Sequence, residues 1–190
     1  MKIFDCFMFY DEELLLDIRL NILDKYVDFF VIVESQFYHN GVKRQLKFDI
    51  KKFNKFKDKI IYIQHKNEPD QIFKLNEKDN EGLKSSKLIH NAHLRENDQR
   101  NHILKGLKKA KNDDLILISD VDEIPNFNSI NLSKIKNQII MFEQEIFYYK
   151  FNRYLTNFKW FGTKACRKKD LQSPQWLRNI KTKQKPFWKI

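Results

Sequence analysis

Four short apolar segments predict buried strands in the first two thirds of the chain. Each is bounded by polar or turn-forming residues, and runs of this length are typical of strands covered on both faces. They lie at residues 3–9, 27–33, 60–63 and 115–118. Further along, residues 139–151 predict one long strand or a hairpin.

Helical spacing of apolar residues separates these strands. A first helix is predicted to follow Asp11 as its N-cap, with Leu15, Ile18 and Ile22 on its buried stripe. A second helix is predicted to begin at Asn97 or Asp98, and its expected buried residues are Ile103, Leu104, Leu107 and Ala110. Residues 66–94 are polar and irregular, which predicts short helices or a flap.

Strands that alternate with helices indicate parallel βαβ units. We therefore expect an α/β fold with a mostly parallel central sheet flanked by helices. The length of 190 residues is that of one domain with a sizeable core.

The acidic sequence Ser119-Asp120-Val121-Asp122-Glu123 directly follows the fourth strand. In open α/β sheets, ligands bind at the carboxyl ends of the strands. Clustered carboxylate oxygens there suit Mg²⁺ or Mn²⁺ carrying a phosphate. The alternative is an acidic turn that caps a following helix. We take the metal site as the working hypothesis.

Three other charged residues are predicted near the same rim. Glu34 ends the second strand and is a candidate for binding a sugar hydroxyl. Lys43 follows an Asn-Gly turn and is a candidate for binding phosphate. Arg100 is expected near a helix start, the unfavourable end for a cation, which indicates a specific anionic partner. The alternative for each is a solvated surface charge.

The formal net charge of +11 is compatible with nucleic acid, an anionic membrane or a phosphorylated substrate. The lysines are dispersed and no nucleic-acid-binding motif is present, so we expect no nucleic-acid partner. The basic segment at 181–189 predicts either a peripheral membrane contact or a solvated chain end. With no signal peptide and no long apolar run, we expect a cytoplasmic location, extending to the inner face of a membrane. Two distant cysteines and five histidines show no metal-ligand spacing.

Four blocks of the sequence, in order, resemble glycosyltransferase family 17, the β-1,4-mannosyl-glycoprotein N-acetylglucosaminyltransferase-like proteins. The blocks are FDCFMFYDEELLLDIRL at 4–20, VIVESQFYHNGVKRQLKF at 31–48, ENDQRNHILKGL at 96–107 and LILISDVDEIP at 115–125. The resemblance implies a GT-A-like nucleotide-diphospho-sugar transferase fold, a UDP-GlcNAc donor and inversion at the anomeric carbon. It also implies Mn²⁺ or Mg²⁺ at Asp120 and Asp122.

The resemblance extends the expected donor site to a set of six residues. These are Glu34, Lys43, Arg100, Ser119, Asp120 and Asp122. Members of the family usually continue beyond the point where this chain stops. We therefore expect a donor-binding part at about 1–125 and an incomplete acceptor part at about 126–190. No catalytic base is assigned, and the candidate carboxylates are Glu143, Glu145 and Asp170.

The sequence thus predicts a metal-dependent inverting glycosyltransferase that moves GlcNAc to a glycan or glycolipid hydroxyl. Two alternatives remain open. One is a Mg²⁺-dependent phosphohydrolase that uses the same Asp-x-Asp turn, although such enzymes usually carry it after the first strand. The other is a basic module that binds an anionic surface or nucleic acid, whose binding would survive the loss of Asp120 and Asp122.

Overall fold

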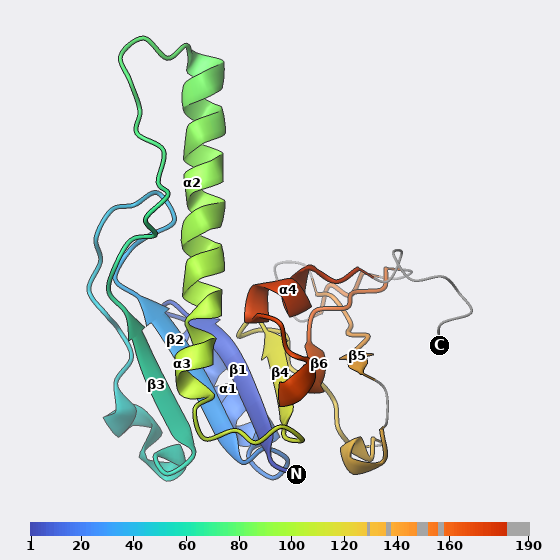
Figure 1. The fold of residues 1–190 in the computed structure, drawn as a ribbon. Helices are drawn as coiled ribbons and strands as arrows, with labels where there is room; N and C mark the ends of the chain where they lie inside the picture. The colour runs from blue at the N-terminus through green and yellow to red at the C-terminus, as the bar shows by residue number, and fades with distance from the viewer. Residues whose placement is uncertain (129, 136–137, 148–151, 156–157, 182–190) are drawn as a thin grey trace.

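The computed structural model describes residues 1–128, 130–135, 138–147, 152–155 and 158–181. Its centre is a six-stranded sheet of order β3-β2-β1-β4-β6-β5 (Figure 1). The strands are β1 Ile3–Phe9, β2 Phe29–Ser35, β3 Ile60–His65, β4 Leu115–Ser119, β5 Ile139–Met141 and β6 Lys164–Arg167. The four strands predicted in the first two thirds of the chain are confirmed, as is the α/β class.

The sheet is mixed. The pairings β1–β2, β1–β4 and β2–β3 are parallel, whereas β4–β6 and β5–β6 are antiparallel. Parallel pairing of the first four strands brings their carboxyl ends to one edge. Because β2 and β3 lie on one side of β1 and β4 on the other, the strand order reverses between β1 and β4. That reversal is where open α/β sheets bind ligands.

Helices cover both faces of the sheet (Figure 1). The helices are α1 Glu13–Leu23, α2 Glu81–Asn101, α3 Ile103–Gly106 and α4 Pro174–Asn179, with 3₁₀ turns at Ile50–Phe56, Leu132–Lys134 and Lys168–Asp170. Alternation along β1 explains the two layers. Phe7 and Phe9 pack with the α1 side, whereas Phe4 and Cys6 pack with the side of α3 and α4.

Helix α1 is rotated from its predicted orientation. It begins at Glu13 after Glu12, so Asp11 is not the N-cap. Its buried residues are Leu16, Arg19, Leu20 and Leu23, whereas Ile22 is 47% exposed. The predicted stripe is therefore wrong at Ile22, whereas Leu15 is partly buried against the core. Apolar residues occupy most positions of this helix, and the orientation that forms is the one that buries Arg19 against Asp5 of β1.

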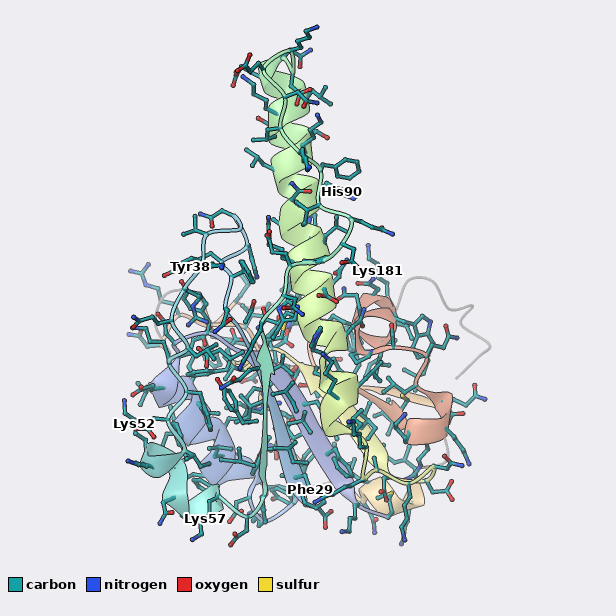
Figure 2. The ribbon with its side chains drawn as sticks, turned by 60° about the vertical axis from the view of Figure 1, so that its left-hand side comes forward. Phe29, Tyr38, Lys52, Lys57, His90 and Lys181 are labelled. Carbon is teal, nitrogen blue, oxygen red and sulfur yellow. The ribbon has the colours of Figure 1, made fainter. Side chains whose placement is uncertain are left out.

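Helix α2 begins much earlier than predicted, so Arg100 lies not near its start but in its last turn, which is the favourable end for a cation. Asn80 caps it by accepting a hydrogen bond from the backbone N–H of Leu83 at 2.8 Å. The first part of the helix projects beyond the sheet, with His90 on this projecting part (Figures 1 and 2). A projecting helix has no apolar stripe to bury. Residues 81–96 therefore show no helical spacing of apolar residues from which the helix could be predicted.

Two further predictions are corrected in part. Ile103 and Leu107 are buried as expected, but Leu104 is exposed. The single long strand or hairpin predicted at 139–151 is, in the described residues, the short strand β5 followed by antiparallel bridges that pair Gln144 with Trp160 and Phe147 with Tyr154. Residues 148–151 of that prediction, and 182–189 of the basic segment, lie outside the described residues. No described helix has the length and apolar character needed to cross a bilayer.

Candidate active site

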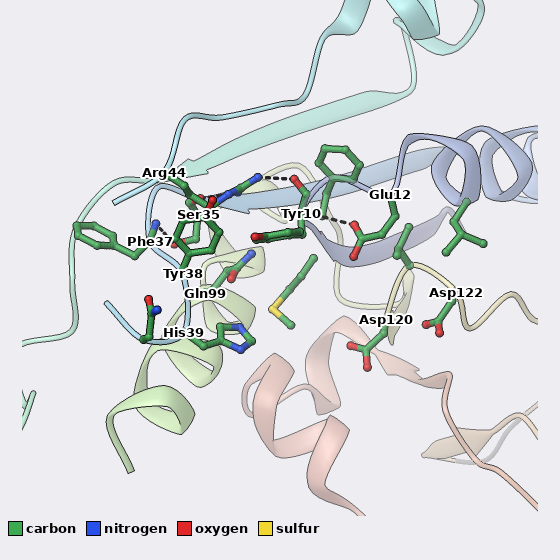
Figure 3. A pocket seen from close by; sticks show the side chains of 15 residues that line it. Tyr10, Glu12, Ser35, Phe37, Tyr38, His39, Arg44, Gln99, Asp120 and Asp122 are labelled. Carbon is green, nitrogen blue, oxygen red and sulfur yellow. Dashed lines mark hydrogen bonds between the residues drawn. The ribbon is translucent and has the colours of Figure 1, made fainter. Parts of the chain in front are cut away.

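A cavity of about 620 Å³ opens at the carboxyl ends of β1, β2 and β4 (Figure 3). One wall is aromatic and comes from the segments after β1 and β2. The opposite wall is the acidic turn after β4, with Asp120 and Asp122. The cavity therefore lies at the carboxyl ends of the strands, as the sequence predicted for the acidic cluster, and at the point where the strand order reverses.

The aromatic wall is built around Arg44. Its guanidinium lies 4.2 Å from the ring centroid of Tyr10 and 5.9 Å from that of Tyr38. The two tyrosine rings are 5.7 Å apart. Arg44 also donates hydrogen bonds to the carbonyls of Tyr10 and Ser35. Planar groups fixed in this way offer a stacking surface for a flat, polar ligand.

Arg19, which was not predicted as a site residue, fixes the backbone of the acidic turn through hydrogen bonds. Arg19 is fully buried and forms a two-point ion pair with Asp5, at 2.8 and 2.6 Å. Its Nη1 also donates to the backbone carbonyls of Asp120, Val121 and Glu123 at 3.0, 3.2 and 3.0 Å. One guanidinium thus fixes the path of the turn.

Asp120 lies between two arginines. Its Oδ1 accepts a hydrogen bond from Arg100 at 3.1 Å, and its Oδ2 accepts one from Arg178 at 2.6 Å. Arg178 also forms a two-point pair with Glu123, at 2.7 and 2.9 Å. The side chain of Arg100 is buried, and its Nε has no hydrogen-bond partner among the described residues.

Asp122 differs from Asp120. No other described residue donates a hydrogen bond to its carboxylate, which faces the cavity (Figure 3). Partial burial raises the pKa of Asp122, and the negative charges of Glu123 and Asp120 raise it further. A cation would relieve this crowding of carboxylates. The oxygen donors of Asp122 and Asp120 therefore fit a hard divalent ion.

A second cavity, of about 870 Å³, lies on the other side of the arginines. Arg100, Arg178 and Lys164 line it together with the aromatic ring of Trp160. Burial lowers the pKa of Lys164 to about 8, and the nearby Arg178 charge lowers it too. Trp160 donates through its Nε1 to Glu123 at 2.8 Å, so this wall is tied to the acidic turn.

Comparison with known families agrees with this geometry. The model of glycosyltransferase family 17 matches residues 1–174. The chain belongs to glycosyltransferase family 17. Searches of curated proteins and of solved structures each found no match.

Membership in family 17 makes the protein an enzyme of sugar transfer, with a nucleotide-sugar donor and an acceptor as its substrates. The phosphohydrolase and the basic binding module are therefore both disfavoured. In this glycosyltransferase the first cavity has the acidic turn on one side and the tilted rings of Tyr10 and Tyr38 on the other.

The remaining donor candidates lie outside the two cavities of this transferase. Glu34 is fully buried, and its carboxylate accepts hydrogen bonds from the backbone of Lys47 and Phe48 and from Tyr62. It also pairs with Arg44 at 3.1 Å, so it supports the aromatic wall from behind. Ser119 is buried and hydrogen-bonded to Arg19.

The other candidates lie further away. Lys43 is exposed on the loop after β2. Glu143 is exposed and pairs with Lys159, Glu145 is exposed, and Asp170 lies on a 3₁₀ turn. None of these four lines either cavity.

Sequence reasoning missed Arg19 and Arg178 as parts of the site. Arg19 carried a signal: it is a charged residue between Leu16 and Leu20 on one helical face, matched by Asp5 within an apolar strand. A buried ion pair between Arg19 and Asp5 explains why each charge occurs within an apolar stretch. Arg178 carried no such signal, because its contact with Asp120 spans 58 residues.

Proposed function

We propose that this family 17 enzyme has a GT-A-like fold and transfers GlcNAc from UDP-GlcNAc, with inversion, to a hydroxyl of a glycan or glycolipid. The observation that carries the proposal is the acidic turn at the reversal of strand order, facing a cavity with an aromatic wall. The uracil and ribose would lie against Tyr10, Tyr38 and Arg44. The diphosphate would then reach Asp122 and Asp120.

We propose a Mn²⁺ or Mg²⁺ ion held by Asp122, with Asp120 as its second carboxylate. When bound, the ion would neutralise charge that develops on the leaving diphosphate. Asp120 already has both oxygens paired with arginines, so Asp122 would supply the first ligand. Arg100 and Arg178 would contribute positive charge beside the same phosphates, since each hydrogen-bonds to Asp120.

The transfer itself would follow from positioning. The acceptor oxygen forms a bond to the anomeric carbon as the bond from that carbon to the phosphate oxygen breaks, and the acceptor hydroxyl loses its proton to a base. We propose that the acceptor sugar lies in the second cavity, with Trp160 as a stacking surface. The ion pairs of Asp120 support this arrangement, because Asp120 lines the first cavity and its partners Arg100 and Arg178 line the second.

The test is donor turnover by the Asp122→Asn variant. With UDP-GlcNAc and Mn²⁺, we expect hydrolysis or transfer to fall by at least about a hundredfold, a loss of about 3 kcal/mol of transition-state stabilisation. The matched control is Asp113→Asn, an exposed carboxylate that precedes β4 and pairs with Lys169. Metal-dependent turnover that is unchanged in Asp122→Asn would overturn the proposal.

A further inference from the structure

Two histidines and an aspartate meet at the base of α2, outside the acidic turn. His65 is the last residue of β3, and Asp98 and His102 are one helical turn apart at the end of α2. Each offers a ligand atom, and these atoms all lie within 4.8 Å of one another. The His65 side chain is only 1% exposed, whereas Asp98 and His102 are partly accessible.

The surroundings orient both imidazole rings. Nδ1 of His65 is hydrogen-bonded to Ser35 Oγ at 3.0 Å, and its Nε2 lies 2.7 Å from Asp98 Oδ2. Nδ1 of His102 lies 3.0 Å from the carbonyl oxygen of Asp98. A carbonyl only accepts, so this Nδ1 carries the proton and Nε2 of His102 keeps its lone pair. Metal-binding histidines use their second nitrogen for such a bond to an oxygen.

We propose that His65, Asp98 and His102 bind one zinc-type divalent ion. Two imidazoles and one carboxylate suit Zn²⁺ and its transition-metal neighbours better than Mg²⁺, which prefers oxygen alone. Three protein ligands leave a fourth position for water. The Asp122 site, built from oxygen, is chemically different, so the protein would distinguish two kinds of metal.

Binding needs only small movements. Tetrahedral Zn²⁺ with bonds of about 2.0–2.1 Å sets its ligand atoms roughly 3.4 Å apart. Asp98 has to open its hydrogen bond to His65, and it is free to do so because it is partly exposed. The proton of His65 then moves from Nε2 to Nδ1, which donates a hydrogen bond to Ser35 Oγ. No proton leaves the site.

The ion would fasten α2 to β3 beside the first cavity. Ser35, which is hydrogen-bonded to His65, and Gln99, which follows Asp98 in the sequence, both line that cavity. Gln99 also donates to the carbonyl of Val33 at 3.1 Å. An ion at this position would therefore stiffen the wall on which we propose the nucleoside lies. The inference stands without that proposal, because the ligands are independent of it.

The experiment is a titration of the full chain with Co²⁺ alone, followed by its visible absorption. Histidine ligation at low coordination number gives intense bands, whereas an all-oxygen octahedral site gives weak ones. We expect intense bands that saturate at one ion per chain in the unaltered protein. His102→Gln should weaken the binding about tenfold or more. His65→Gln should do the same.

Two controls separate this site from the others. His90→Gln removes an exposed histidine from the same helix and should leave the bands unchanged, as should Asp122→Asn. Zn²⁺ should also raise the unfolding temperature of the unaltered protein, and at the same concentration should raise that of His102→Gln less. Absence of intense bands, a Co²⁺ affinity that is unchanged in His102→Gln, or bands lost in Asp122→Asn would each overturn the inference. Absence of intense bands would mean that the cluster is only a chain of hydrogen bonds from Ser35 through His65 to Asp98.

Discussion

Replacing Arg19 with methionine tests the idea that one buried guanidinium organises the site. The substitution keeps much of the side-chain volume but leaves Asp5 as a buried charge without its partner, and both side chains are fully inaccessible in the native protein. Removing one member of a buried pair costs about 3–5 kcal/mol. Domains of this size are stable by about 5–15 kcal/mol. We therefore expect Arg19→Met to lose a large fraction of its free energy of unfolding.

The double variant Asp5→Leu/Arg19→Met distinguishes the cost of an unpaired Asp5 charge from the loss of the hydrogen bonds that Arg19 donates to the acidic turn. Replacing a buried pair by apolar side chains is often neutral or stabilising, so urea denaturation should show that most of the lost stability returns. The carbonyls of Asp120, Val121 and Glu123 still lack their donor in this variant. Calorimetry should therefore show that this variant still binds UDP-GlcNAc weakly in the presence of Mn²⁺.

The exposed pair of Lys52 and Glu13 is the matched control, because both side chains are about half exposed. Lys52→Met should cost less than about 1 kcal/mol. A loss of that small size in Arg19→Met would refute the reasoning about the buried pair. Full donor affinity in the double variant would refute the idea that Arg19 holds the acidic turn.

Three further predictions concern stability and reactivity. Gly106→Ala should destabilise the protein by about 1–3 kcal/mol, because the added Cβ would lie 2.4 Å from a Val31 methyl group. The control Gly82→Ala should be neutral or mildly stabilising, and thermal unfolding of the two variants tests the difference. Burial lowers the pKa of Lys164 to about 8, so between about pH 8 and 10.5 the unfolded chain binds more protons than the folded protein. The free energy of unfolding, measured by urea denaturation, should therefore rise across that window by up to about 3 kcal/mol more than in Lys164→Met. Burial raises the pKa of Cys166 to about 12 and that of Cys6 well above its usual value, so iodoacetamide should label neither thiol until urea unfolds the protein, as mass spectrometry would show.

The parts of the fold that follow from local pattern could be predicted from the sequence. The strands that end at Glu34-Ser35 and Ser119 are apolar runs buried on both faces, and such runs carry their own signal. Their parallel arrangement follows from the helices between them. The position of Asp122 beside the first cavity follows in turn from the place of its strand in this arrangement.

The parts that depend on distant partners could not be predicted. The face that α1 buries is decided by Asp5, because the helix has apolar residues on most sides and only one orientation pairs Arg19. Glu34 ends its strand as expected, but its neighbours turn it away from the ligand rim. The meeting of Arg178 with Asp120 depends on the route of the chain after β5, where the sequence shows little periodicity.

The projecting part of α2 has a consequence for cooperativity. A helix of 21 residues is about 30 Å long, and only its second half lies over the sheet. The first half is held by the preceding loop, where Asn91 bonds to the backbone of Phe73 and Lys87 pairs with Asp79. This loop and half-helix can therefore open as a local unit, with faster amide exchange than the sheet. The end near Asn80 is accordingly the position at which a label or an inserted peptide would least disturb the enzyme.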